Sequence, residues 1–352
     1  MQCTTRFPDH CPEAPEDVAD MTVPLVTAAF TAYNAQDTIL PALASAMAQD
    51  WPALEILVID DASSDSTPAL VETFIRDRSE AVRPIRLIRQ SHNGGVAQTR
   101  NHLITEARGE FIAFFDDDDV SALNRISRQY DRILDVEASV GHDLILCHTA
   151  REQVFPGGHS HYEATMGCEG ISAPVGADVA DRILLGRLSP GVIGSCATCS
   201  QMARRSVYIR LGGFDSTLLR CEDTDLNIRC ALKGGAFAGV AAPLVRQAMT
   251  TGIEKGLLAE FDSYAVLQDK YHDYLASHGW LDFTLRWREV RQDYMQRRKG
   301  LFFVRLLSLG LHSPVKLAKK VYWSLPADRT RRHLRYWHHT AFPPSSPESD
   351  MP

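Results

Sequence analysis

The chain has 352 residues, of which 45% are hydrophobic and 23% are charged, a composition typical of globular proteins. Its net charge of -7 argues against nucleic acid as a partner of the whole chain. No run approaches the ~18 uncharged apolar residues that a membrane span needs, since the longest candidate, Leu301 to Leu311, contains Arg305. The first twenty residues carry proline and acids where a signal peptide has a basic start and an apolar run, so we expect a cytoplasmic protein.

Eight cysteines lie at irregular spacings, which does not suggest a disulfide framework. Cys196 and Cys199 form the only C-x-x-C pair. A structural zinc site usually needs a second pair or suitably spaced histidines, and neither lies nearby. We therefore expect two packed thiols at this pair.

Short β-rich runs alternate with helical patterns between residues 23 and 150. The expected strands are Leu25–Thr31, Leu54–Asp60, Ile85–Arg89, Phe111–Phe115 and Leu144–His148. The expected helices are Asp37–Gln49, Ser66–Asp77, Val96–Ala107 and Asn124–Glu137. Near-continuous apolar strands separated by helices are typical of a mostly parallel sheet covered on both faces, so we expect a three-layer αβα sandwich.

The pattern weakens from Arg151 to Pro190, where glycines are frequent and one helix is expected near Gly176–Leu185. A strand running into a short helix is expected over Ser200–Leu211. A helix opened by acids follows at Glu222–Lys233 and ends at Gly234 and Gly235.

Polar clusters follow four of the expected strands. They are Thr31-Ala-Tyr33-Asn34, Asp60-Asp61, Asn93-Gly94-Gly95 and Asp116-Asp117-Asp118-Asp119. Ligands of open parallel sheets bind beyond the carboxyl ends of the strands. The four clusters therefore predict one ligand site at this edge of the sheet.

The four successive carboxylates of residues 116–119 repel one another, and each close pair costs about 1–4 kcal/mol. A hard divalent cation, Mg²⁺ or Mn²⁺, bound together with the oxygens of a diphosphate, would offset that repulsion. The alternative is an acidic helix start. Asn93 and Gly94 offer a backbone that phosphate or sugar can approach closely, and Arg100 lies on the helix that follows.

These residues resemble a known family. The runs TAYN, LEILVIDDASSDST, NGGVAQTRN, GEFIAFFDDDD and GGFDSTLLRCEDTDL are similar, in order and spacing, to those of family 2 glycosyltransferases, over roughly residues 23 to 240. The resemblance implies a GT-A-type fold and an inverting enzyme that uses a nucleotide-sugar donor.

The resemblance also implies roles for the residues that match. Asp61 would bind the nucleotide base, with Thr31 in the same pocket, and Asn34, Asn93, Gly94 and Arg100 would line the donor site. Asp116 and Asp118 would form the metal-binding DxD element, with Asp118 as the direct ligand and with Asp117 and Asp119 either near the ribose or outside the direct ligands. Asp223 matches the catalytic base. Gly213, Phe214 and Glu222 would form the acceptor side.

The implied mechanism is a single displacement. Asp223 would take the proton of an acceptor hydroxyl as that oxygen attacks the anomeric carbon, and Mn²⁺ or Mg²⁺ would neutralise the leaving diphosphate. The chain departs from many relatives at Val245–Ala248, because the histidine of their Arg-x-His element is missing. A third protein ligand to the metal is therefore not identified.

The basic C-terminal region has 14 Lys and Arg against 4 Asp and Glu between residues 281 and 340. Basic helices with aromatic residues suit an anionic membrane surface, and packing on the catalytic domain with a solvated basic face is the alternative. We expect a flexible tail at 1–22, a catalytic domain at 23–255, a helical basic region at 256–340 and a disordered tail at 341–352. The catalytic domain divides into a nucleotide-sugar half (23–150) and an acceptor half (151–255).

The sequence thus predicts a metal-dependent transferase that acts on a glycan or lipid-linked acceptor in polysaccharide synthesis, in the cytoplasm or at the inner face of the plasma membrane. The alternatives are a non-catalytic scaffold that binds a nucleotide sugar or glycan, and a nucleotidyltransferase. The latter lacks its Gly-rich basic N-terminal signature here.

Overall fold

The computed structural model describes residues 23–78, 83–167, 173–189, 191–249 and 253–324. Both expected tails, and the part of the basic region beyond residue 324, lie outside these ranges. A nine-stranded sheet forms the centre of the molecule, in the order β3-β2-β1-β4-β8-β6-β9-β5, with β7 paired to β6.

The first part of the chain builds the parallel part of the sheet. The strands are β1 (Val26–Ala32), β2 (Leu54–Asp60), β3 (Ile85–Arg89) and β4 (Phe111–Asp116), which pair in parallel. The helices between them are α1 (Ile39–Met47), α2 (Thr67–Arg76) and α3 (Val96–Glu106). These elements agree with the expected ones to within about two residues at each end.

The second part of the chain extends the sheet beyond β4. Its strands are β5 (Val120–Ser121), β6 (Ile145–Val154), β7 (Ser160–Glu163), β8 (Gln201–Arg204) and β9 (Ala236–Ala248). Its helices are α4 (Arg125–Val140), α5 (Ala177–Leu185), α6 (Arg205–Leu211) and α7 (Glu222–Leu232), with a short 3-10 turn at Thr198–Ser200. β8 is antiparallel to both β4 and β6, whereas β6 and β9 are parallel.

Helices cover both faces of the sheet, as the sequence predicts. α1, α2 and α4 pack on the face that carries Val26, Ala28 and Phe30 of β1. α3, α5, α6 and α7 pack on the other face, over the side chain of Ala29 and those of neighbouring strands. The three-layer αβα sandwich is therefore confirmed.

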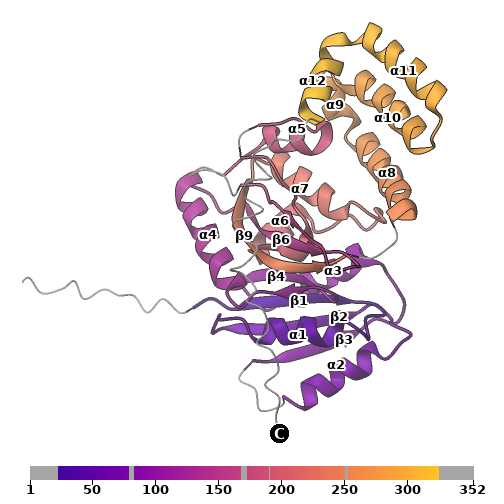
Figure 1. Cartoon of the computed structure of the whole chain (residues 1–352). Coiled ribbons are helices and arrows are strands. Elements are labelled where there is room, and N and C mark those ends of the chain that lie inside the picture. The colour runs from indigo at the N-terminus through magenta and orange to yellow at the C-terminus, as the bar shows by residue number, and fades with distance from the viewer. Residues whose placement is uncertain (1–22, 79–82, 168–172, 190, 250–252, 325–352) are drawn as a thin grey trace, which may run out of the picture.

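Five further helices follow the sheet: α8 (Ile253–Lys270), α9 (His272–Ser277), α10 (Leu281–Met295), α11 (Lys299–His312) and α12 (Pro314–Ser324). They lie at the opposite end of the molecule from α2 and β3 (Figure 1). A buried cluster joins them to the sandwich, in which Leu184 of α5 and Ile228 of α7 pack with Leu267 of α8. Contacts thus cross the predicted domain boundary at residue 255.

Buried His148 gives one prediction about stability. Its ring lies on β6, fully buried, 2.9 Å from the Gln201 side chain and stacked on Phe237. Burial, and then the charges of Arg151 and Arg125, lower its pKa to about 3. Between pH 6.5 and 3 the unfolded chain therefore binds a proton that the native chain does not, so the free energy of unfolding falls as the pH falls through this window.

We expect the urea midpoint to drop between pH 7.5 and pH 5, and we expect His148→Gln to reduce that drop. The matched control is His159→Gln, because His159 is exposed. An identical drop in the His148→Gln variant would contradict the assignment.

Candidate active site

The four predicted polar clusters meet at the carboxyl ends of the parallel strands. Thr31 of β1 pairs with Asp116 of β4, and the Asp117 carboxylate accepts a hydrogen bond from the backbone N–H of Tyr33 at 2.9 Å. Beside them, the Asn34 side chain accepts a hydrogen bond from the backbone N–H of Ser64 at 2.9 Å. The loops after β1, β2 and β4 therefore form one edge, as predicted.

Asp61 holds the glycine turn that follows β3. Its buried carboxylate accepts hydrogen bonds from the backbone N–H groups of Gly94 (2.8 Å) and Gly95 (3.0 Å) and from the Gln90 side chain (2.7 Å). Asn93 also accepts from Gly95. A carboxylate has about four acceptor positions, so the chain itself uses most of those of Asp61. Contact between Asp61 and a nucleotide base stays a prediction.

The acidic run is crowded: Asp119 is buried, and the three aspartates before it are partly exposed. Burial, and then the charges of neighbouring aspartates, raise the pKa of Asp117 to about 7 and that of Asp119 to about 8. Burial and the charge of Asp116 raise the pKa of Asp118 as well. At neutral pH the run therefore needs protons or a cation to compensate its charge.

Three of the described residues offer ligand atoms to a metal ion within 4.8 Å of one another: Asp116, Asp119 and Cys199. The Asp119 carboxylate accepts from the backbone N–H of Ala248 through one oxygen (3.3 Å), while its other oxygen is buried and has no hydrogen-bond partner in the part of the chain that the structure describes. Two carboxylates, one of which has an unsatisfied oxygen, fit a hard divalent cation. The group includes predicted ligand Asp116, whereas Asp118 is not in it.

Arg100 connects the acidic run to α7. Its guanidinium lies 2.6 Å from the Glu222 carboxylate and 3.5 Å from that of Asp116. Burial opposes the charged form, but the charges of Asp116, Glu222 and Asp223 outweigh it and raise the pKa of Arg100. Burial raises the pKa of Glu222 in spite of this partner. Arg100 thus holds two acids of the site together.

Asp223 lies in the first turn of α7, next to Glu222. Cys221 precedes this turn with a φ of 63°, a left-handed conformation that sets the direction in which α7 starts. The carboxylate of Asp223 is partly exposed and accepts a hydrogen bond from the Thr224 hydroxyl at 3.1 Å. Its charge acts on Arg100, which also contacts Asp116, and its role as the base stays a prediction.

The structure of the turn after α6 requires a glycine at position 213. Gly213 has a φ of +70°, and a Cβ there would lie 2.4 Å from the Asn101 side-chain oxygen. That side chain both donates to the backbone C=O of Phe214 (2.8 Å) and accepts from its N–H (2.7 Å). The Phe214 ring lies 5.5 Å below the Arg100 guanidinium. The turn is thereby fixed against the site.

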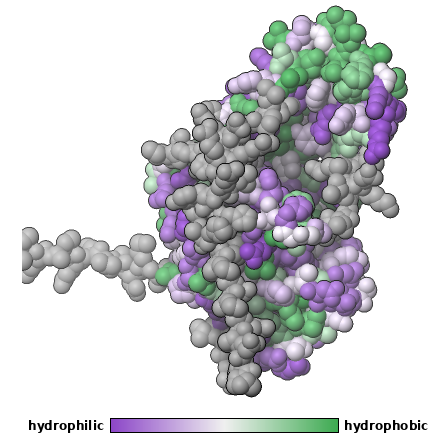
Figure 2. Space-filling view, viewed as in Figure 1, coloured by the Kyte–Doolittle hydropathy of each residue, from purple (hydrophilic) through white to green (hydrophobic). Residues whose placement is uncertain are grey.

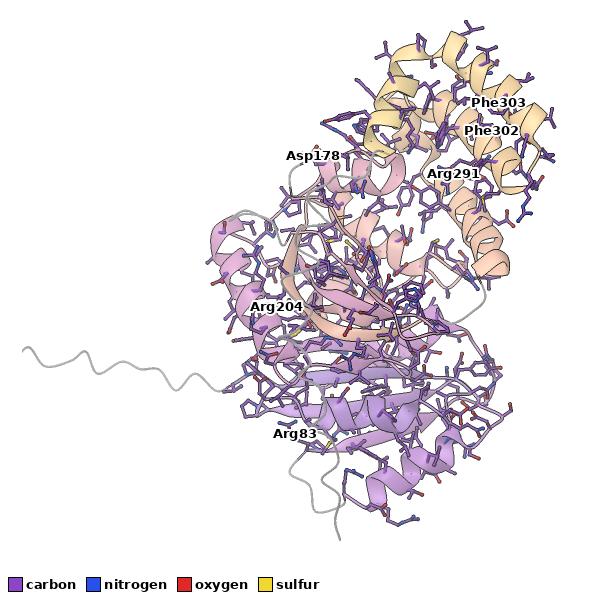
Figure 3. The ribbon with its side chains drawn as sticks, viewed as in Figure 1. Arg83, Asp178, Arg204, Arg291, Phe302 and Phe303 are labelled. Carbon is purple, nitrogen blue, oxygen red and sulfur yellow. The ribbon has the colours of Figure 1, made fainter. Side chains whose placement is uncertain are left out.

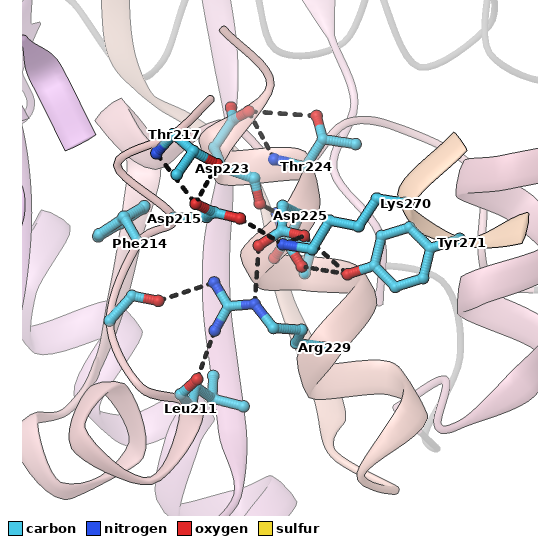
Figure 4. A network of polar contacts seen from close by, with 12 residues as sticks. Leu211, Phe214, Asp215, Thr217, Asp223, Thr224, Asp225, Arg229, Lys270 and Tyr271 are labelled. Carbon is cyan, nitrogen blue, oxygen red and sulfur yellow. Dashed lines mark hydrogen bonds and ion pairs between the residues drawn. The ribbon is translucent and has the colours of Figure 1, made fainter. Parts of the chain in front are cut away.

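A polar network behind Asp223 was not predicted. The fully buried Asp225 carboxylate lies 2.7 Å from Arg229 and 2.6 Å from Lys270, and accepts from the Tyr271 hydroxyl at 2.8 Å (Figure 4). Lys270 also lies 2.6 Å from Asp215 and lowers the pKa of that carboxyl. α8 is thus tied to the helix that carries Asp223.

The model of the family described as "Glycosyl transferase family 2" matches residues 27–210, more than half of the chain and most of the strands that carry these residues. The chain belongs to glycosyl transferase family 2.

Curated proteins are similar to about a third of the chain. The succinoglycan biosynthesis protein ExoO of Rhizobium meliloti is 42% identical over 110 residues, which cover 31% of this chain and 30% of the relative. The UDP-Glc:alpha-D-GlcNAc-diphosphoundecaprenol beta-1,3-glucosyltransferase WfgD of Escherichia coli is 36% identical over 110 residues, 31% of this chain and 41% of the relative. The matches thus cover less than half the length of these relatives.

A solved structure supports the fold. S. aureus TarS 1-349 in complex with UDP is 18% identical and has a TM-score of 0.51, covering 69% of this chain and 64% of that one. At this identity the likeness shows the fold alone, which is GT-A-like, as predicted.

Proposed function

We propose that this family 2 member transfers a sugar from a nucleoside diphosphate donor to a hydroxyl of a glycan or lipid-linked acceptor in polysaccharide synthesis. The observation that carries the proposal is that the loops after β1 and β4 meet at one edge of the sheet, where Arg100 joins Asp116 to Glu222, the neighbour of Asp223. Relatives named for succinoglycan and for diphosphoundecaprenol acceptors support this class of pathway. Structures of TarS with UDP and with UDP-GlcNAc support a uridine nucleotide.

In the proposed mechanism, Asp223 accepts the proton of the acceptor hydroxyl as that oxygen attacks the anomeric carbon. Arg100 keeps Glu222 and Asp116 in place, so the base helix and the donor edge stay aligned. The rest of the acceleration comes from positioning the two substrates. Attack opposite the diphosphate inverts the configuration at the anomeric carbon.

Asp116 and Asp119, with Cys199 beside them, would hold Mn²⁺ or Mg²⁺. When bound, the ion supplies charge neutralisation to the leaving diphosphate. Asp118 follows in the same loop, where burial and the charge of nearby Asp116 raise its pKa, and remains the metal ligand that the family resemblance implies.

A panel of UDP-, GDP- and dTDP-sugars tests the proposed function. We expect one nucleotide class to bind in calorimetry in the presence of Mn²⁺ or Mg²⁺, and to release nucleoside diphosphate when an acceptor mixture is added. Absence of both binding and turnover across the panel would overturn the proposal.

We further propose that α11 and α12 contact the inner face of the plasma membrane. Among the described residues no single helix is long and apolar enough to span a bilayer. Taken together, α11 and α12 have the length and the apolar composition of a span, but the chain bends by 118° between them. Residues 299–323 contain five Lys and Arg and no Asp or Glu. Apolar side chains gather over this end of the molecule (Figure 2), including Phe303 and Leu307, which are 64% and 67% exposed. Exposed apolar residues among cations suit an interface with anionic lipids.

Vesicle binding checks this contact. We expect the chain to sediment with vesicles of phosphatidylcholine and phosphatidylglycerol and to bind pure phosphatidylcholine at least tenfold more weakly. Fully burying Phe303 or Leu307 is worth about 1.5–3 kcal/mol each, so the double variant Phe303→Glu/Leu307→Glu should lose binding by at least tenfold. The matched control is Ile209→Glu on α6, at a 55% exposed residue of the sandwich. Equal losses in both would contradict the proposal.

A further inference from the structure

A cavity of about 520 Å³ lies between α5 and the C-terminal helices α8, α10 and α12. None of its lining residues belongs to the strand-end site. Six aromatic side chains line it: Phe261, Tyr264, Trp280, Phe283, Trp287 and Tyr294. This volume and lining are those of small-molecule sites, which are mostly apolar with a few polar groups.

The charged groups of the cavity are all cations. Arg291 and Lys320 line it, and none of its lining residues is an Asp or Glu. The Arg291 guanidinium lies 5.6 Å from the ring centre of Phe261. Burial, and then the charges of Arg291 and Arg182, lower the pKa of Lys320 to about 8. An anion bound between these groups would therefore relieve their mutual repulsion.

Gln268 adds a polar group to the same wall. The side chain is 7% exposed, and its Oε1 atom is buried with no hydrogen-bond partner among the described residues. An unsatisfied buried amide indicates a missing partner. Aromatic rings and cations together fit a ligand that has both an apolar part and an anionic part. The Gln268 oxygen is an acceptor, so it would take a hydrogen bond from a hydroxyl of that ligand.

Aromatic contacts lead from the cavity to the exposed face of α11. Tyr294 lines the cavity, is 71% exposed and contacts the Phe302 ring at 5.7 Å, and Phe302 contacts Phe303 at 5.1 Å. Figure 3 shows Arg291, Phe302 and Phe303 together in this group of helices. A row of aromatic contacts therefore links one lining residue of the cavity to the surface for which we propose a membrane contact.

We propose that this cavity binds an anionic amphiphile, with its apolar part among the aromatic rings and its phosphate or carboxylate at Arg291 and Lys320. A bilayer phospholipid and a lipid-linked acceptor would supply the same chemistry. Only the choice between a bilayer phospholipid and a lipid-linked acceptor rests on the proposed function.

Decyl phosphate, used below its micelle concentration without vesicles, donor or metal, tests the proposal on the full chain. We expect saturable binding in calorimetry and a matching change in the fluorescence of Trp280 and Trp287. Arg291→Gln should weaken binding at least fivefold. Arg286→Gln, an exposed change on the same helix, should leave it within twofold.

Two neutral or non-lipid probes give the outcomes that would overturn the proposal. If decyl maltoside bound as tightly as decyl phosphate, the site would not require an anionic group. If inorganic phosphate bound equally tightly, the site would not require an apolar chain. Absence of saturable binding would also overturn it. Because the assay contains no donor, Asp223→Asn should bind decyl phosphate normally, which separates this test from that of the transferase.

A second arm identifies the source. Phosphatidylcholine vesicles are supplemented with either phosphatidylglycerol or a polyprenyl phosphate, and tryptophan fluorescence is followed. A response to both supports a general lipid site, and a response to the polyprenyl phosphate alone supports the carrier of an acceptor.

Discussion

Replacing Asp223 with Asn is expected to lower the rate of sugar transfer by about 10²–10⁴-fold, the usual contribution of a general base. The amide keeps the shape of the carboxylate but cannot take the proton of the acceptor hydroxyl. Arg100 retains Glu222 and Asp116 as partners, so the donor edge should stay intact. Calorimetry should show nucleotide-sugar binding within about threefold of that of the unchanged chain.

The matched control is Asp135→Asn, which makes the same chemical change at an exposed residue of α4. Its transfer rate should not change. If Asp223→Asn transferred sugar at the unchanged rate, the base would have to be another group. Nucleotide-sugar binding without any transfer by the unchanged chain would instead favour the non-catalytic scaffold.

The second large effect is expected for Asp116→Asn. Asp116 contributes to the candidate metal site and faces Arg100, so losing its charge weakens the cation site directly. We expect Mn²⁺ affinity to fall more than tenfold and transfer to fall by about 10²-fold or more. Chelation of the metal in the unchanged chain should abolish transfer, and added Mn²⁺ should restore it.

Two further variants help to interpret the effect of Asp116→Asn. Asp131→Asn on the exposed side of α4 controls for the loss of one negative charge and should leave Mn²⁺ affinity unchanged. Cys199→Ser should change it only if the sulfur is a ligand. Transfer that proceeds fully in the presence of chelator would contradict metal dependence.

The parallel half of the fold could be predicted because its signals are local. β1, β2 and β4 are short runs of mostly apolar residues, and α1 and α2 bury a mostly apolar face, so period and order were enough. The meeting of four polar clusters followed from the topology alone, since parallel strands end at one edge.

β9 was not predicted because its sequence argues against a central strand. Gly239 and Pro243 interrupt it, and both are unfavourable inside a sheet. The structure accommodates Pro243 at an irregularity of the β6–β9 pairing, where the register shifts around Ala150. Only the tertiary pairing with β6 reveals this strand.

Two members of the site were missed for a similar reason. Asp119 was placed near the ribose or outside the direct ligands, and Cys199 was predicted to be a packed thiol. Cys199 is indeed buried and free, but it lies beside Asp116 and Asp119. Residues 116 and 199 come together only because β8 pairs with β4, and no spacing in the sequence carries that information.

The link between Lys270 and Asp225 limits how C-terminal helices can be exchanged among members of the family. A chimaera that takes α8 from another protein would leave the fully buried carboxylate of Asp225 without one of its two cations, unless residues 225 and 270 are transferred together. The helix that this loss would destabilise first is α7, which carries Asp223. Acceptor preference and the identity of the C-terminal helices are therefore expected to be inherited together.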